Sequence, residues 1–161
     1  AQQHQAQRIS SSLIRTDLQH GRLHEAAQKL GRPYSIEGKV VRGKQLGRTL
    51  GYPTANIRLQ RKKPALMGIY ATWIHGVGQQ PIAGVSSLGT RPTVNGREPL
   101  LEAHLFDFDD DLYRRRIRVE FVCKLRDEIK FDTLDALVMQ MDQDAAQARA
   151  VLALQPIGEC A

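Results

Sequence analysis

Residues 117–124 read IRVEFVCK, a stretch that alternates between apolar and polar side chains. One face comprises Ile117, Val119, Phe121 and Cys123, and the other includes Arg118, Glu120 and Lys124. A period of two is typical of a β-strand with one buried face. The pattern therefore predicts a strand and places Cys123 in the protein core, where a thiol is packed rather than reactive.

Four further segments are short, rich in β-branched and aromatic residues, and bounded by glycine, proline or charged turns. They read SIEGKVV (35–41), GIYATWIH (68–75), PIAGVSSL (81–88) and LLEAHLF (100–106). The stretch GTRPTV (89–94) is predicted to be a turn that supports the last of these. Strands of this length at this spacing predict a small antiparallel barrel or sandwich.

Helical periodicity flanks the strands. Residues 12–30 are predicted to form two short helices, with Leu13, Ile14 and Leu18 on one face, separated by Gly21 and ended by residues 31–33. Near the C-terminus, Asp132 or Thr133 can cap a third helix. Its apolar stripe comprises Leu134, Leu137, Val138, Met141, Ala145 and Ala148. We interpret Met139 and Met141 as core packing.

The composition is that of one globular domain: 161 residues, of which 42% are hydrophobic and 25% charged. No apolar run approaches the roughly 20 residues of a membrane helix, and the first residues, AQQHQAQR, lack the apolar segment of a signal peptide. Cys123 and Cys160 form neither a metal-ligand spacing nor a disulfide framework. We therefore expect a cytoplasmic protein without a membrane partner.

The net charge of +6 raises the hypothesis of nucleic-acid binding. The basic clusters comprise Arg58, Arg61, Lys62 and Lys63, and then Arg114, Arg115, Arg116 and Arg118. Neither cluster carries the interleaved aromatic residues of a single-strand binding platform. Solvated loops are the favoured interpretation, and the positive field would also attract an anionic small substrate.

The segment LGRTLGYPTANI (46–57) combines two glycines, a proline and two small polar residues. The glycines permit turns and close backbone approach, and the proline favours an extended chain before it. If the chain stays extended, Thr54 and Asn56 point to the same face. A phosphate and a divalent cation would suit such a site. The alternative is a tight turn whose Thr54 and Asn56 satisfy local backbone groups.

Glu102 is unusual because it lies between Leu100 and Leu105, where an unpaired carboxylate is costly. His104 shares its face if this segment is a strand. The alternative is a barrel-rim glutamate that is solvated or ion-paired. Common motifs do not compete with this candidate: the chain contains no Walker A motif, no G-x-S-x-G and no H-E-x-x-H.

Together these stretches resemble the riboflavin kinase family. The similar segments, in order, are GKVVRGKQLGRTLGYPTANI, GIYA, GVSSLGTRPTV, LEAHLFDFDDDLY and KLRDEIKF, which lie within about residues 31–154. The chain resembles in particular the C-terminal module of the bacterial bifunctional riboflavin kinase and FAD synthetase. RISSSLIR (8–15) is similar to the end of the nucleotidyltransferase module that precedes it.

The resemblance implies a mainly β fold: a six-stranded antiparallel Greek-key-type barrel with short N-terminal helices and a C-terminal helix. It divides the chain into a remnant of the preceding module with linker helices (1–30), a kinase domain (31–155) and a tail (156–161). The remnant is expected not to contribute to catalysis, and the fragment is expected not to make FAD. In the intact protein the partner would be the N-terminal FAD synthetase module.

The implied reaction transfers the γ-phosphoryl group of ATP to the 5′-hydroxyl of riboflavin, giving FMN, with Mg²⁺ as the metal. Glu102 would be the general base, with His104 in a supporting role, and Thr54 and Asn56 would hold Mg²⁺. The residues implied for ATP are Gly43, Gly47, Arg48, Gly51, Leu88 and Tyr113. The residues implied for the flavin are Arg126 and Phe131, which could instead be a surface charge and a core aromatic.

Two positions depart from the family pattern. Arg114 stands where the family usually has a glycine, and Ser87 stands where it tends to have asparagine. Both lie near the expected substrate sites. The alternative function is a non-catalytic β-barrel that binds flavin or nucleic acid, and it would not need Thr54, Asn56 and Glu102 together.

Overall fold

The structure is a computed structural model that describes residues 11–43, 46–59 and 64–154. The described strands are β1 (Ser35–Val41), β2 (Ala55–Ile57), β3 (Gly68–His75), β4 (Ile82–Thr93), β5 (Gly96–Leu105) and β6 (Arg116–Arg126). The described helices are α2 (Ser11–Gln19), α3 (Leu23–Leu30), α4 (Leu46–Thr49) and α5 (Leu134–Leu154). Arg61, Lys62, Lys63, Cys160 and the predicted tail lie outside the described residues. Within the described ranges, no helix is both long and apolar enough to span a membrane.

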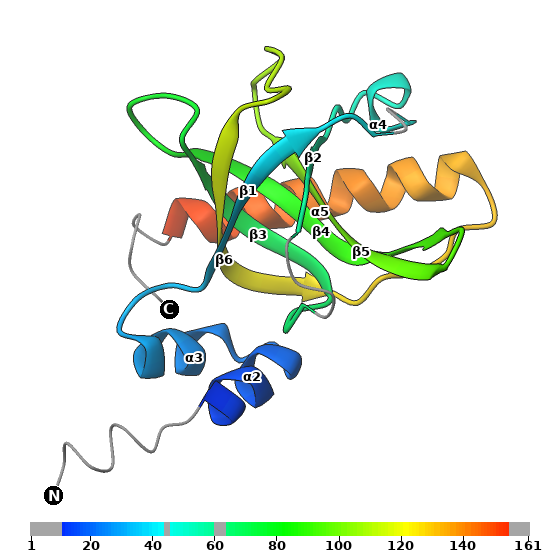
Figure 1. The fold of residues 1–161 in the computed structure, drawn as a ribbon. Coiled ribbons are helices and arrows are strands. Elements are labelled where there is room, and N and C mark those ends of the chain that lie inside the picture. The colour runs from blue at the N-terminus through cyan, green and yellow to red at the C-terminus, as the bar shows by residue number, and fades with distance from the viewer. Residues whose placement is uncertain (1–10, 44–45, 60–63, 155–161) are drawn as a thin grey trace, which may run out of the picture.

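The six strands form a closed antiparallel barrel in the order β1-β2-β5-β4-β3-β6 (Figure 1). Consecutive hairpins join β3, β4 and β5, and β6 returns to pair with β3, which is a Greek-key arrangement. The predicted barrel is therefore confirmed, and the sandwich alternative is excluded. β2 is only three residues long, yet it pairs with β1 on one side and with β5 on the other.

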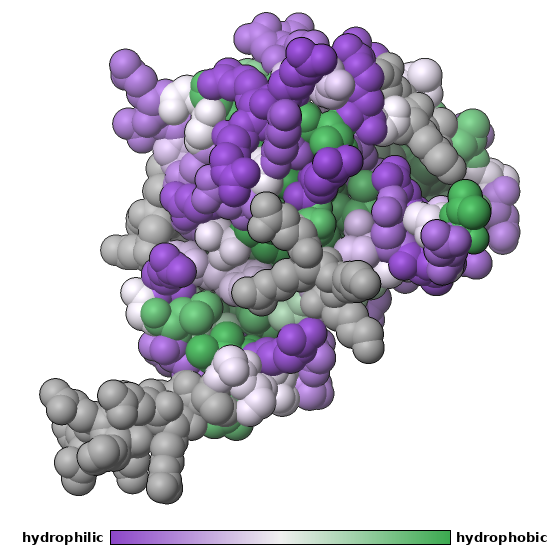
Figure 2. Space-filling view, viewed as in Figure 1, coloured by the Kyte–Doolittle hydropathy of each residue, from purple (hydrophilic) through white to green (hydrophobic). Residues whose placement is uncertain are grey.

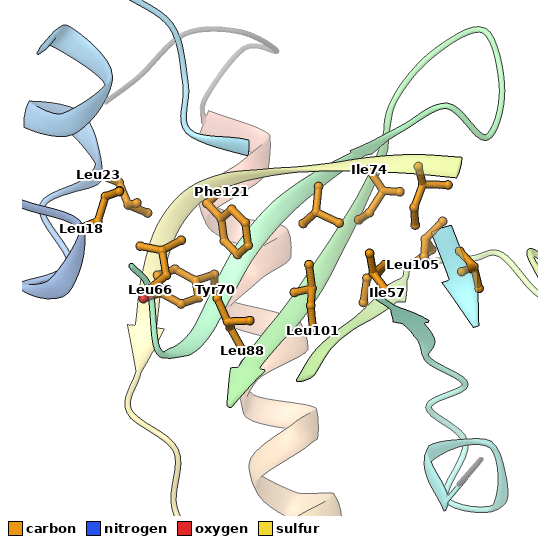
Figure 3. Packing of buried hydrophobic residues seen from close by; sticks show 14 of the residues in the cluster. Leu18, Leu23, Ile57, Leu66, Tyr70, Ile74, Leu88, Leu101, Leu105 and Phe121 are labelled. Atoms are coloured by element: carbon orange, nitrogen blue, oxygen red, sulfur yellow. The ribbon is translucent and has the colours of Figure 1, made fainter. Parts of the chain in front are cut away.

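The interior of the barrel is filled by the apolar face of each strand. Ile117, Val119 and Phe121 of β6 are almost completely buried there, as their alternation predicted. The Phe121 ring meets the Tyr70 ring edge-on, with 5.2 Å between ring centroids, and the Tyr70 hydroxyl donates to the Met67 carbonyl oxygen at 2.9 Å. Figure 3 shows the Phe121 and Tyr70 side chains close together, coming from neighbouring strands.

Cys123 does not follow this alternation, so its predicted face is wrong. Phe121 pairs with Thr72 and Cys123 with Ala71, which leaves Val122 as an extra residue in a β-bulge. The bulge turns Cys123 to the outer face of the barrel, where it packs with Ala71 in a second apolar cluster that includes residues of α5. Burial raises the pKa of the Cys123 thiol, in agreement with a packed and unreactive cysteine.

The stretch 89–94 is not a turn, contrary to the prediction. β4 continues through it to Thr93 and pairs with β5 from Gly89↔Leu100 to Thr93↔Gly96. The turn of this hairpin is limited to the two residues between the strands, and Gly96 takes a φ of 133° that favours glycine. The long hairpin gives β5 a rigid partner along its whole length.

The N-terminal helices α2 and α3 pack against one end of the barrel. Leu18, Leu23 and Ala26 belong to the same buried cluster as the barrel interior, and Figure 3 shows Leu18 and Leu23 extending from the helices toward Leu66. Asp17 is buried between them and accepts from Lys29 and from Arg22. The predicted break between the helices is confirmed by Gly21, whose φ is 73°. These helices therefore contribute to the core.

Helix α5 crosses the outer face of β3, β4 and β6. Thr133 caps it, because the Ala136 amide donates to Thr133 Oγ1 at 3.1 Å. The interpretation of both methionines as core residues is wrong for Met139, whose exposed fraction is 63%. Only one stripe of a surface helix faces the barrel, and two residues along the helix reverse the direction of a side chain. Leu134, the first residue of α5, is exposed as well, although it belongs to the predicted apolar stripe.

The shared core predicts that α2 stabilises the barrel. Leu18→Ala should lower the free energy of unfolding by about 2–4 kcal/mol, because it opens a cavity at a 2% exposed site. Leu13→Ala, on the same helix but 48% exposed, is the matched control and should change it by less than about 0.5 kcal/mol. Urea unfolding of both variants measures the difference. Equal, small effects would mean that α2 is not part of the folding unit.

Candidate active site

A cavity of about 100 Å³ opens between the loops at one end of the barrel, and we call it the loop cavity. It is lined by Val40, Val41, Arg42, Gly43, Arg48, Pro53, Thr54, Ala55, Asn56, Leu105 and residues 108–113. Figure 2 shows hydrophilic side chains gathered over this upper end of the molecule. The lining combines two arginines and three aspartates with Thr54 and Asn56, which the sequence singled out.

The glycines of this region permit close packing rather than free movement. A Cβ on Gly43 would overlap the Asn56 amide, and a Cβ on Gly47 would overlap the Tyr52 carbonyl oxygen. The Tyr52 amide donates back to the Gly47 carbonyl oxygen at 2.7 Å, and Gly51 takes a left-handed φ of 85°. The segment therefore folds over α4 and returns as the extended chain that leads into β2.

Thr54 and Asn56 lie side by side on the loop cavity. Asn56 is only 7% exposed, and its register partners are Val41 of β1 and Glu102 of β5. The extended chain at Ala55–Ile57 excludes the tight-turn alternative for Asn56. Pairing on both sides holds this amide in one place.

Tyr113 forms another wall of the loop cavity. The guanidinium carbons of Arg42 and Arg114 lie 4.3 Å and 5.3 Å from the centroid of its ring, and Arg114 lowers the pKa of the Tyr113 hydroxyl. Arg114 has a φ of 74°, and its amide donates to the Val40 carbonyl oxygen at 3.0 Å. The position where the family usually has glycine is therefore one whose backbone conformation favours glycine.

A second cavity, of about 170 Å³, lies between the outer face of the barrel and α5, and we call it the helix cavity. It is lined by Tyr52, Thr54, Ile69, Val85, Ser87, Glu102, His104, Arg126, Leu137, Met141, Asp144 and Ala145. Thr54 lines both cavities. A molecule in one cavity can therefore meet a molecule in the other at this residue.

Glu102 projects from the outer face of β5 into the helix cavity. It is half-buried and lies in register between Asn56 of β2 and Ser87 of β4. Burial raises the pKa of its carboxyl group, the negative charge of Glu128 raises it further, and Arg91 acts in the opposite direction. A carboxylate with a raised pKa is a stronger base than an ordinary surface glutamate.

His104 shares the face of Glu102, as predicted, and also lines the helix cavity. Its Nδ1 lies 2.8 Å from the Pro53 carbonyl oxygen; a carbonyl only accepts, so Nδ1 carries the proton. Its ring meets the Tyr52 ring edge-on, with 5.1 Å between the ring centroids. The Tyr52 hydroxyl donates to Asp142 of α5, and burial together with Asp142 raises the pKa of Tyr52 to about 12.

Arg126 lines the helix cavity but is not the surface charge that one interpretation proposed, because its side chain is 16% exposed and pairs with Asp144. Phe131 does not line the cavity. Its ring lies under the guanidinium of Arg126 at 5.7 Å. Phe131 therefore packs against Arg126 without lining the cavity itself.

The structure brings most of the predicted residues to the two cavities. The exceptions are Gly47, Gly51, Phe131 and Leu88. Leu88 is completely buried inside the barrel, which leaves its predicted ATP contact without structural support. Sequence reasoning missed Arg42, Tyr52 and Asp144. Only Asp144 had a usable signal, because it is an acid within the apolar stripe of α5.

Two cavities that share Thr54, with a carboxylate of raised pKa in one of them, suit a transferase that binds two substrates side by side. The model of the riboflavin kinase family matches residues 30–152. The chain belongs to this family, whose members phosphorylate riboflavin with ATP.

Individual relatives agree with the family assignment. The chain is 46% identical over 145 residues to the bifunctional riboflavin kinase/FMN adenylyltransferase of Haemophilus influenzae, covering 90% of this chain and 47% of the relative. The chain thus spans about half the length of the curated relatives it matches.

Two solved structures resemble the fold. Riboflavin kinase from Trypanosoma brucei has a TM-score of 0.56 and 25% identity, covering 76% of this chain and 78% of that one. A Streptococcus pneumoniae chain described as a macrolide-efflux protein has a TM-score of 0.79 and 36% identity, and the match covers 88% of this chain and 46% of that one.

The left-handed backbone of Arg114 predicts a stabilising substitution. Arg114→Gly should raise the free energy of unfolding by about 0.5–1 kcal/mol, because glycine adopts this φ without a Cβ clash. The control is Arg118→Gly within β6, which should lower it by about the same amount. Urea unfolding at neutral pH compares them. A destabilised Arg114→Gly would mean that the contacts of Arg114 with Tyr113 outweigh the backbone strain.

Proposed function

We propose that this chain transfers the γ-phosphoryl group of ATP to the 5′-hydroxyl of riboflavin, with ATP in the loop cavity and riboflavin in the helix cavity. The observation that carries the proposal is the position of Thr54, which lines both cavities. Glu102 lies in register with Asn56, across the β2–β5 pair. The donor phosphate, the acceptor hydroxyl and a base can therefore meet at one point.

The loop cavity suits a nucleoside triphosphate. Arg42 and Arg48 line it, beside the aspartates at 109–111, and are the groups that would pair with the phosphates. The backbone of Gly43 lies against the Asn56 amide. The Tyr113 ring packs against the guanidinium of Arg42 and helps to hold it at the cavity. Gly47 and Gly51 act indirectly, by shaping the segment that carries Thr54.

The metal of the family reaction is proposed to be Mg²⁺, held by Thr54 and Asn56. Their hydroxyl and amide oxygens are hard, neutral ligands on one wall of the loop cavity. In the part of the chain that the structure describes, no cluster of three acidic, histidine or cysteine residues could hold a metal. This donor set fits an ion that takes its other ligands from phosphate and water, as Mg²⁺ does. The bound ion would neutralise charge on the phosphates.

Glu102 is proposed as the general base. As the bond forms between the riboflavin oxygen and the γ-phosphorus, the bond from phosphorus to the ADP oxygen breaks, and the hydroxyl proton passes to the Glu102 carboxylate. His104 already donates its Nδ1 proton to Pro53, the residue before Thr54. It is therefore better placed to hold this segment than to accept the proton.

In the intact protein, an FMN adenylyltransferase module would precede this chain and use its product. The chain alone should then make FMN and no FAD. A non-catalytic flavin-binding barrel is the alternative, and it would not need Thr54, Asn56 and Glu102 together at the two cavities.

Incubation of the chain with ATP, Mg²⁺ and riboflavin, followed by chromatography, tests the proposal. FMN and ADP should appear in equal amounts. Binding of riboflavin without phosphorylation would favour the non-catalytic alternative.

Glu102→Gln keeps the shape of the side chain and removes the base. We expect kcat to fall by about 10²- to 10⁴-fold with riboflavin binding preserved. Glu37→Gln is the matched control, since Glu37 is exposed and pairs with Arg116, and it should leave kcat unchanged. His104→Asn should reduce kcat clearly less than Glu102→Gln. A near-normal kcat in Glu102→Gln would exclude Glu102 as the base.

The raised pKa of Glu102 also predicts a pH dependence. The acid limb of kcat/KM should have its midpoint above 4.5, the ordinary value for glutamate. Because the folded pKa is raised, the native state loses stability as pH rises through it, whereas Glu102→Gln does not titrate there. Relative to the wild type, this variant should therefore become more stable in urea unfolding as the pH rises above 4.5. A constant difference would mean that Glu102 is not perturbed.

A further inference from the structure

Asp144 is a buried carboxylate on the wall of the helix cavity, with a side chain that is 5% exposed. Arg126 Nε donates to its Oδ1 and Oδ2 at 2.9 Å and 3.1 Å, and Arg126 Nη2 donates to Oδ2 at 2.7 Å. Gln140 Nε2 donates to Oδ1 at 3.0 Å. This two-point contact fixes the plane of the guanidinium.

The pairing does not use all the donors of Arg126. Of the five N–H groups of a guanidinium, Asp144 takes two, and the Asp127 carbonyl oxygen takes one at 3.0 Å from Nη1. Among the residues that the structure describes, the other two, one on each terminal nitrogen, have no hydrogen-bond partner. Since Arg126 lines the helix cavity, these donors lie at the edge of a site that is otherwise largely apolar.

Most of the other side chains around Arg126 are apolar and cannot fix the orientation of its guanidinium by hydrogen bonds. Leu137, Met141 and Ala145 form the α5 side of the cavity at helical spacing, and Phe131 lies under the guanidinium. A buried ion pair is a weak source of stability, because apolar residues of similar volume often do as well. A pair whose sole function is to join β6 to α5 would not need to border the cavity.

We propose that Asp144 is a positioning residue for the acceptor: it holds Arg126 so that the two remaining N–H groups meet the carbonyl oxygens of the riboflavin ring system. The inference rests on the proposed function, because it takes riboflavin as the molecule in the helix cavity. A fixed guanidinium binds at lower entropic cost than a mobile one. Asp144 would thus act on riboflavin binding without touching riboflavin.

Asp144→Asn tests this inference, with Asp135→Asn on the exposed first turn of α5 as the matched control. In Asp144→Asn we expect the KM for riboflavin to rise about 10- to 100-fold, which is the loss of a charge-assisted hydrogen bond. The KM for ATP should change less than about twofold. Asp135→Asn should leave both KM values unchanged. Riboflavin fluorescence on titration with the protein gives an independent Kd.

A double variant separates positioning from structural support. Arg126→Met with Asp144→Leu replaces the pair by apolar side chains and should keep Tm close to that of the wild type. Its KM and Kd for riboflavin should nevertheless be higher than those of the wild type, because the two Arg126 N–H groups that face the cavity are gone. This variant decides the question if Asp144→Asn does not fold.

Two results would overturn the inference: a folded Asp144→Asn with an unchanged KM for riboflavin, or a double variant that recovers both Tm and riboflavin affinity. A wild-type chain that forms no FMN would instead contradict the proposed function. The two failures are therefore distinguishable, because the first requires an active wild-type enzyme.

Discussion

The pairing of β2 with both β1 and β5 is the constraint on which the rest of the structure depends. Three residues, Ala55–Ile57, close the barrel. The same pairing puts Ile57 in the interior and Asn56 on the outer face, in register with Glu102. A shift of one residue would exchange these faces. Closure of the core and assembly of the proposed catalytic group are therefore one event.

The inner and outer faces of the barrel have different roles. Its interior is apolar and fixes the strands, whereas the outer face of β5 carries Glu102 and His104 into a cavity covered by α5. Hydrogen bonds join that helix to both sides of the site: the Tyr52 hydroxyl donates to Asp142, and the Arg126 guanidinium donates to Asp144. The helix cavity consequently has a wall that is held by polar contacts as well as by packing.

The sequence predicted what depends on local pattern. The period of two in β6, the glycine break between α2 and α3, and the shared face of Glu102 and His104 all follow from neighbouring residues. The bulge that turns Cys123 outward depends on pairing with β3, and the exposure of Met139 depends on which stripe of α5 meets the barrel. Contacts distant in sequence, such as Tyr52 with Asp142, leave no local periodicity to detect. Leu88 shows a limit of motif matching. The family resemblance named it as an ATP contact, but its side chain is completely buried in the barrel interior.

The central claim is that the two cavities meet at Thr54, with Glu102 beside the acceptor. A crystal structure of the chain with ADP, Mg²⁺ and riboflavin tests it most directly. The account predicts ADP in the loop cavity, riboflavin against α5, and the riboflavin 5′-hydroxyl oxygen about 2.6–3.2 Å from a Glu102 carboxylate oxygen. A complex in which riboflavin lies outside the helix cavity, or in which its 5′-hydroxyl points away from Glu102 and Thr54, would contradict it.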